Sequence, residues 1–158
     1  MYHALVALHL LAAVAWIGGM LFLSLVLAPL VKNRKAAPEF MALFRSAALR
    51  FRVVVWTAIA LLLTTGPVLL ARRGMMLTNP ASWSSVATVK IWLVLLLLVV
   101  TVLHDVVLGP QVGRASSIPA SSRTAWEKLA VSTARWVPRF SLLLSLVVIV
   151  VAVILARS

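Results

Sequence analysis

Four long apolar stretches divide the chain, and each is bounded by charged residues or turn formers. They cover residues 4–31, 53–71, 86–108 and 137–156. As a helix, the first stretch would be about 42 Å long, which exceeds the roughly 30 Å hydrocarbon core of a bilayer. It is too long, and lacks the opening positive charge, to be typical of a cleaved signal peptide. The pattern therefore predicts an all-α integral membrane four-helix bundle, formed as a single four-span domain by residues 1–158.

Two of the three connections carry apolar residues at helical spacing. In residues 32–52 the apolar stripe consists of Phe40, Phe44, Ala47 and Phe51. The third connection should begin as a loop at residues 109–113 and continue as a stripe of Trp126, Leu129, Ala130 and Thr133. Such stripes beside basic residues are typical of helices that lie in the membrane interface. We expect one short amphipathic interfacial helix in each of these connections, and the first of them should run into the second span.

Composition and charge agree with a membrane protein and predict its orientation. Hydrophobic residues make up 63% of the chain and charged residues 11%, which excludes a water-soluble domain. Of the 15 lysines and arginines, 11 lie in the first and third connections or at Arg139. The positive-inside bias places these connections in the cytoplasm and both termini outside. The basic residues behind the net charge of +12 are then expected to contact anionic lipid headgroups, and nucleic acid is not an expected partner.

The first span contains an isolated histidine, and ionisable residues inside apolar spans are candidates for function. His9, Trp16 and Met20 project within about 20° of one direction on a helix. Ala12, Ala15 and Gly19 form an adjoining stripe of small residues that lets another helix approach closely. We expect His9 to face the bundle, either as a metal or haem ligand or as a histidine hydrogen-bonded to backbone or water.

Methionines and a second histidine could add ligands on the same predicted outer side. His3 lies about 120° round the helix from His9, so both can bind one ion only if the amino terminus unwinds. Thioether and imidazole ligands suit Cu(I), which makes His9, His3, Met75 and Met76 a candidate copper site. In the alternative interpretation, Met75 and Met76 only touch the lipid headgroups. The chain has no cysteine, which excludes thiolate metal sites.

The third span holds the other ionisable residues, Lys90, His104 and Asp105. Because adjacent residues diverge on a helix, we expect His104 and Asp105 not to pair with each other. Asp105 is expected to form an ion pair with Lys32, Arg52 or Arg139, or else to act with His104 in proton relay or ligand binding. Lys90 either reaches the outer headgroups or binds a quinone, a haem propionate or an anionic lipid.

One geometric argument limits how these residues combine. The first and third spans run parallel, with His9 near the outer end and His104 nearer the cytoplasmic end. The two histidines should therefore differ in depth by about 20 Å, so that one haem iron cannot bind both. A haem bound to His9 would need a second ligand of another kind, from a second copy or from another subunit.

Several of these features resemble a known family. The run from His9 to Pro29 (HLLAAVAWIGGMLFLSLVLAP), the pair Thr65-Gly66 and the run Thr88-Val89-Lys90 resemble the CopD-like copper resistance proteins of bacterial inner membranes. The chain is similar, less closely, to the four-helix HemJ-like protoporphyrinogen oxidases. The positions that match are His9, Trp16, Gly18, Gly19 and Lys90.

The resemblance implies a multi-pass protein of the bacterial inner membrane that binds, handles or transports copper. The alternatives are a haem b or quinone-linked redox protein, with His9, Trp16, Lys90 and His104 as candidate cofactor-binding residues, and a structural subunit of a larger membrane complex. Whether the protein is an enzyme stays open. Membrane lipid is an expected partner, together with a second copy of the chain or a membrane or periplasmic protein.

Overall fold

The computed structural model describes residues 1–33, 38–116, 118–134 and 136–157. Within these ranges every regular element is a helix, which confirms the predicted all-α class. The helices form two compact units, Met1–Trp83 and Ser84–Ser158, and each is described here by itself.

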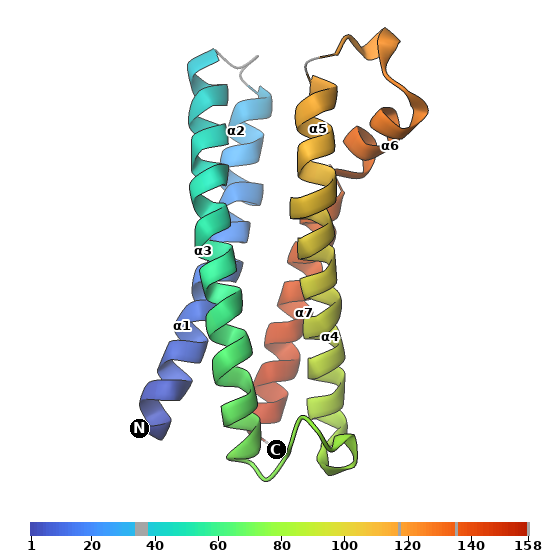
Figure 1. Ribbon diagram of the computed structural model, residues 1–158. Coiled ribbons are helices and arrows are strands. Elements are labelled where there is room, and N and C mark those ends of the chain that lie inside the picture. Colours follow the sequence, from blue (N-terminus) through green and yellow to red (C-terminus); the bar gives the residue numbers. More distant parts are fainter. Residues whose placement is uncertain (34–37, 117, 135, 158) are drawn as a thin grey trace. The chain divides into compact units, whose positions relative to one another are not determined.

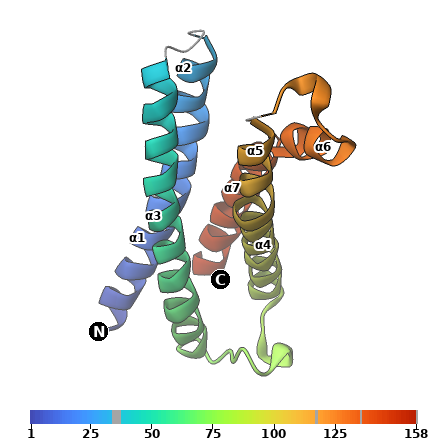
Figure 2. The ribbon, with the colours of Figure 1, turned by 45° about the horizontal axis from the view of Figure 1, so that its top comes forward.

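Unit 1 is an antiparallel pair of long helices (Figures 1 and 2). Its elements in chain order are α1 (Tyr2–Leu21), the π-helical η1 (Phe22–Leu27), α2 (Ala28–Asn33), α3 (Pro38–Ala71) and the short 3₁₀ helix η2 (Pro80–Ser82). The first three form one rod, and α3 returns beside it over 34 residues. On α1 the side chains of Ala12, Trp16 and Ile17 are buried, whereas Ala15 of the predicted small-residue stripe is exposed.

Unit 2 also contains a long helix and an antiparallel partner (Figure 1). Its elements are α4 (Ser85–Val102), the π-helical η3 (Leu103–Leu108), α5 (Gly109–Ser116), the 3₁₀ helix η4 (Ala120–Ser122), α6 (Ala125–Ala134) and α7 (Val137–Arg157). The α4–α7 pair closes over small buried residues, among them Ala87, Ser141 and Ser145. A second close contact joins α5 and α6, where Ala115 and Ala130 are almost completely buried.

A π-helical turn followed by proline occurs in both units. In unit 1, η1 ends at Leu27 and Pro29 is the second residue of α2; in unit 2, η3 ends at Leu108 and Pro110 is the second residue of α5. Proline has no N–H and its ring clashes with the carbonyl four residues earlier. A wider turn just before the proline moves that carbonyl aside, so the helix continues. The sequence shows no obvious internal repeat, yet both units contain this arrangement.

The π turn explains one wrong prediction. Residues 109–113 were expected to open a loop because they contain Gly109, Pro110 and Gly113, but they lie in α5. The helix ends at Ser116 instead. The helix predicted in the first connection is confirmed in its course, since α3 runs without interruption from Pro38 into the second span. Its place in the membrane interface stays a prediction. The predicted helix around Trp126 is present as α6.

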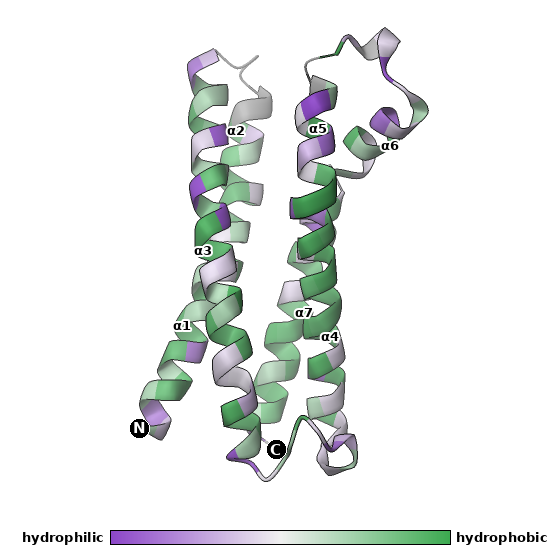
Figure 3. Cartoon of the chain, in the orientation of Figure 1, coloured by the Kyte–Doolittle hydropathy of each residue, from purple (hydrophilic) through white to green (hydrophobic). Residues whose placement is uncertain are grey.

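Four of the helical segments are long and apolar enough to cross a membrane. They are Tyr2–Leu30, Pro38–Ala71, Ser85–Ala115 and Ala125–Arg157, the last of which includes α7. Large apolar side chains such as Leu10, Leu11 and Val14 are more than half exposed on the outside of α1. Figure 3 shows the hydrophilic residues concentrated toward the helix ends and the apolar residues along their lengths. This distribution suits helices surrounded by lipid.

Candidate functional site

The clearest polar contact between two spans joins His9 of α1 to Thr65 of α3. The imidazole Nδ1 lies 2.7 Å from the Thr65 hydroxyl oxygen, and that hydroxyl lies 2.5 Å from the Leu61 carbonyl one turn earlier. Thr65 is buried. The neighbouring Gly66 lies against the ring, and a Cβ at this position would make an ordinary van der Waals contact with His9 Cε1 at 3.6 Å. The expectation that His9 faces another helix is therefore confirmed.

These two hydrogen bonds favour one tautomer of a neutral His9 ring. A threonine hydroxyl has one proton, and the Leu61 carbonyl lies in a position to accept it. With that proton on the Leu61 side, the hydroxyl oxygen accepts from Nδ1–H of His9, and the lone pair of the neutral ring is on Nε2. Metal-binding histidines are commonly oriented in this way, by an acceptor that holds the non-ligating nitrogen.

Trp16 lies two turns further along α1, as its spacing from His9 predicted. Its side chain is 96% buried, and its indole Nε1 has no hydrogen-bond partner within the described part of the chain. An unpaired buried donor is unfavourable in a low-dielectric interior. Close helix approach continues at Gly19, where an added Cβ would collide with the Phe51 ring of α3. The glycine thus allows α1 and α3 to touch.

The other predicted copper ligands are placed less favourably. His3 lies in the first turn of α1, with its ring edge-on to Tyr2. Figures 1 and 2 both show this end of α1 leaning away from the end of α3. Among the residues described, no group of three or more His, Asp or Glu side chains could hold a metal ion.

Met75 and Met76 follow the end of α3 and have different surroundings. Gly74 has a φ of +75°, its N–H bonds the Ala71 carbonyl, and the Met75 N–H bonds the Leu70 carbonyl. This is a Schellman motif, which commonly buries an apolar side chain at the Met75 position, and Met75 is indeed buried. Met76 is 62% exposed, while its backbone is held by Ser82 and the Trp83 indole. The burial of Met75 is therefore explained by helix termination.

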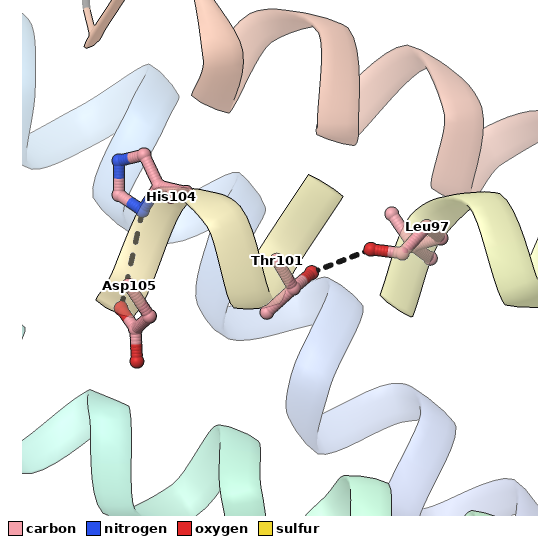
Figure 4. A network of polar contacts seen from close by, with 4 residues as sticks. All are labelled: Leu97, Thr101, His104 and Asp105. Carbon is pink, nitrogen blue, oxygen red and sulfur yellow. Dashed lines mark hydrogen bonds and ion pairs between the residues drawn. The ribbon is translucent and has the colours of Figure 1, made fainter. Parts of the chain in front are cut away.

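His104 and Asp105 lie in the π turn η3 (Figure 4). Their side chains approach to 3.9 Å between Nδ1 and Oδ1, so the prediction that these neighbours do not pair is wrong. The distance exceeds a hydrogen bond, and the attraction acts when the imidazole is protonated. One turn earlier, the Thr101 hydroxyl donates to the Leu97 carbonyl.

The predicted partners of Asp105 stay predictions. Arg139 lies over the Trp136 ring at 4.9 Å, and the Lys32 side chain is outside the described part of the chain. Lys90 is half-buried in the second turn of α4, which is compatible with a lysine whose stem packs along the helix.

These four long apolar helices define a multi-pass α-helical membrane protein. Residues 11–117 match a protein family described as a domain of unknown function, DUF4149, and the chain belongs to this family. The matched range contains Trp16, Thr65, Lys90 and His104, whereas His9 lies two residues before it. Neither the curated proteins nor the solved structures contain a match.

Proposed function

We propose that this protein binds a copper ion on the outer side of the bacterial inner membrane, with the imidazole of His9 as a ligand. The observation that supports the proposal is the chain from Nδ1–H of His9 through the Thr65 hydroxyl to the Leu61 carbonyl. It directs the lone pair to Nε2, the state in which imidazole coordinates a metal. Soft Cu(I) accepts nitrogen and thioether donors in low coordination number.

The remaining donors come from outside the α1–α3 contact. Met76 and His3 are both exposed and both belong to the ends of spans on the proposed outer side. Met75 is left out of the proposed ligand set because the end of α3 buries it. A second copy of the chain, or a periplasmic protein that delivers or receives copper, is the other source of a donor. Either one would give the protein a role in copper handling or transport.

The orientation is part of the proposal. Arg45, Arg50 and Arg52 lie in the first half of α3, and Arg114 and Lys128 lie in α5 and α6. With the positive-inside bias, these ends face the cytoplasm, and both termini with His9 face outward. The exposed Trp126 and Leu129 of α6 then lie in the cytoplasmic interface, the place that an amphipathic helix prefers.

Copper titration of the purified full-length protein tests the proposal. Cu(I) binding is measured by competition with a chromophoric chelator for the wild type, His9→Ala and Thr65→Val. We expect His9→Ala to lose the tightest site, and Thr65→Val to weaken it by about 10–100-fold because the imidazole loses its orienting acceptor. His104→Ala is the matched histidine control and should bind as the wild type does. Equal affinity in the wild type and His9→Ala would refute the assignment.

A haem or quinone redox protein is the second candidate, and Trp16 favours it. Its buried indole N–H has no acceptor among the described residues, and a quinone carbonyl or a haem propionate is an acceptor of the right kind. A bound haem would supply one-electron chemistry, and the imidazole of His9 would be a ligand for its iron. An absorption spectrum of the purified protein separates the candidates, since haem gives a Soret band that His9→Ala would shift or remove.

A structural role in a larger membrane complex is the third alternative. Co-purification with other membrane proteins, without bound metal or colour, would favour that role over both binding functions.

A further inference from the structure

An apolar groove of about 310 Å³ runs along unit 1 between α1 and α3. Its α1 wall includes Leu8, Leu11 and Ala15, and its α3 wall includes Val54, Thr57 and Leu61. Of the described residues that line it, only Thr57 has a polar side chain. His9 and Trp16 do not line this groove, so it is separate from the proposed copper site.

A basic side chain stands at one end of the groove. Arg50, Val54, Thr57 and Leu61 follow one another at intervals of four, three and four residues, and therefore share one face of α3. Arg50 is exposed. On the facing helix, Gly18 lies one turn beyond Ala15, and a Cβ there would meet nothing within 4 Å. The groove is thus open toward the turn that carries Arg50.

The other two arginines of α3 lie on different faces of the helix from Arg50. On a regular helix Arg52 lies about 160° from Arg50, and Arg45 about 140° from it. Arg50 also precedes Val53, where the apolar part of α3 begins. Among the three arginines of α3, Arg50 is therefore the one in line with the groove.

The chemistry of the groove distinguishes between occupants. The groove extends about 12 Å along α3 between Val53 and Leu61, and its described lining is apolar apart from Thr57. An acyl chain is apolar along its whole length and suits such walls. Arg50, in line with the groove on the same face of α3, suits the anionic headgroup to which such a chain is attached.

We propose that an anionic phospholipid binds unit 1, with one acyl chain in the groove and its phosphate against Arg50. The apolar walls replace contacts with bulk lipid, and the guanidinium adds a charge-assisted hydrogen bond to phosphate. Anionic headgroups are attracted to basic residues at the membrane surface, so charge selects this lipid over a zwitterionic one.

Native mass spectrometry of the full-length protein tests the proposal. The delipidated protein is titrated with phosphatidylglycerol or phosphatidylcholine, and bound lipid is counted. We expect the wild type to prefer phosphatidylglycerol and Arg50→Gln to lose about fivefold in affinity for it, with little change for phosphatidylcholine. Arg45→Gln is the matched control on another face and should behave as the wild type.

A second variant tests the groove itself. Ala15→Leu puts a branched side chain into an exposed wall position and should weaken the binding of both lipids. Ala60→Leu makes the same change at an exposed position of α3 outside the groove and should not. Unchanged lipid binding by Ala15→Leu would overturn the proposal in favour of another element covering the groove. An equal loss from Arg45→Gln and Arg50→Gln would overturn it in favour of general surface attraction. Neither readout depends on copper.

Discussion

Both units contain a π turn followed by a proline, but their helices pack against each other through different side chains. In each, a long helix widens into a π turn two residues before a proline and then continues. Unit 1 joins its helices through a polar contact, His9 with Thr65, and through the Phe51 ring over Gly19. Between α4 and α7, unit 2 buries Ala87 and the serines Ser141 and Ser145. The similar backbone therefore carries a histidine contact between two helices in unit 1 and a histidine contact within the π turn in unit 2.

Polar residues stand at equal distances before the two prolines, which extends this comparison. Five residues before the proline stand Ser24 in unit 1 and Asp105 in unit 2. Twenty residues before it stand His9 and Lys90. Inserted π turns often occur at functional sites, because they change which side chains face a neighbouring helix. The equivalent spacing places one ionisable residue near the start of the first helix of each unit.

The largest effect is expected at the Gly19–Phe51 contact. Gly19→Ala brings a Cβ into the Phe51 ring and should lower the free energy of unfolding by about 1–3 kcal/mol. Gly18→Ala has the same gain in helix propensity and no neighbour within 4 Å, so it should be neutral or slightly stabilising. Thermal unfolding of both variants in the same detergent measures the difference. Equal unfolding temperatures would show that unit 1 does not depend on this close approach.

A smaller effect is expected when a threonine hydroxyl is removed. One such hydroxyl bonds a side chain of a second helix, and the other bonds only the backbone of its own helix. Thr65→Val removes the acceptor for His9 and should cost about 1 kcal/mol, as interhelical hydrogen bonds in membranes do. Thr101→Val in unit 2 removes a bond within one helix, to the Leu97 carbonyl, and should have a smaller effect. Unfolding by denaturant, measured for both variants, makes the comparison. A larger loss for Thr101→Val would contradict the difference that we draw between the units.

The sequence predicted the number and location of the spans because their hydrophobicity is strong over more than 18 residues. It did not predict α5 as a helix, since Gly109 and Pro110 are local signals for a turn. The helix continues through them because η3 adapts the backbone before the proline. Whether a helix continues through a proline depends on the stability of the whole segment in its surroundings. The residue types at positions 109 and 110 alone do not show this.

The candidate site was predicted in part. Helical periodicity placed His9 and Trp16 on a face directed at another helix, and the resemblance drew attention to Thr65-Gly66. The contact between His9 and Thr65 could not be derived, because it requires the register of α1 against α3. Counting residues along the two antiparallel spans would have placed these two residues at similar levels, since His9 lies several residues after the start of the first span and Thr65 several residues before the end of the second. The approach of His104 to Asp105 was missed because the prediction assumed a regular α-helix, whereas both residues lie in the π turn η3.

The smallest effect concerns how the first helix of each unit begins. No side chain caps the start of α1, whereas the Ser84 hydroxyl caps α4 by accepting from the Ala87 N–H at 3.2 Å. Ser84→Ala should cost about 0.5–1 kcal/mol, and Ser84→Asp, which can also cap, should keep most of the stability. Hydrogen exchange should rise at Ala87 and its neighbours in Ser84→Ala, with little change in unit 1. If both variants exchange equally fast, the cap does not stabilise the start of α4, and the two units begin their first helices in the same way.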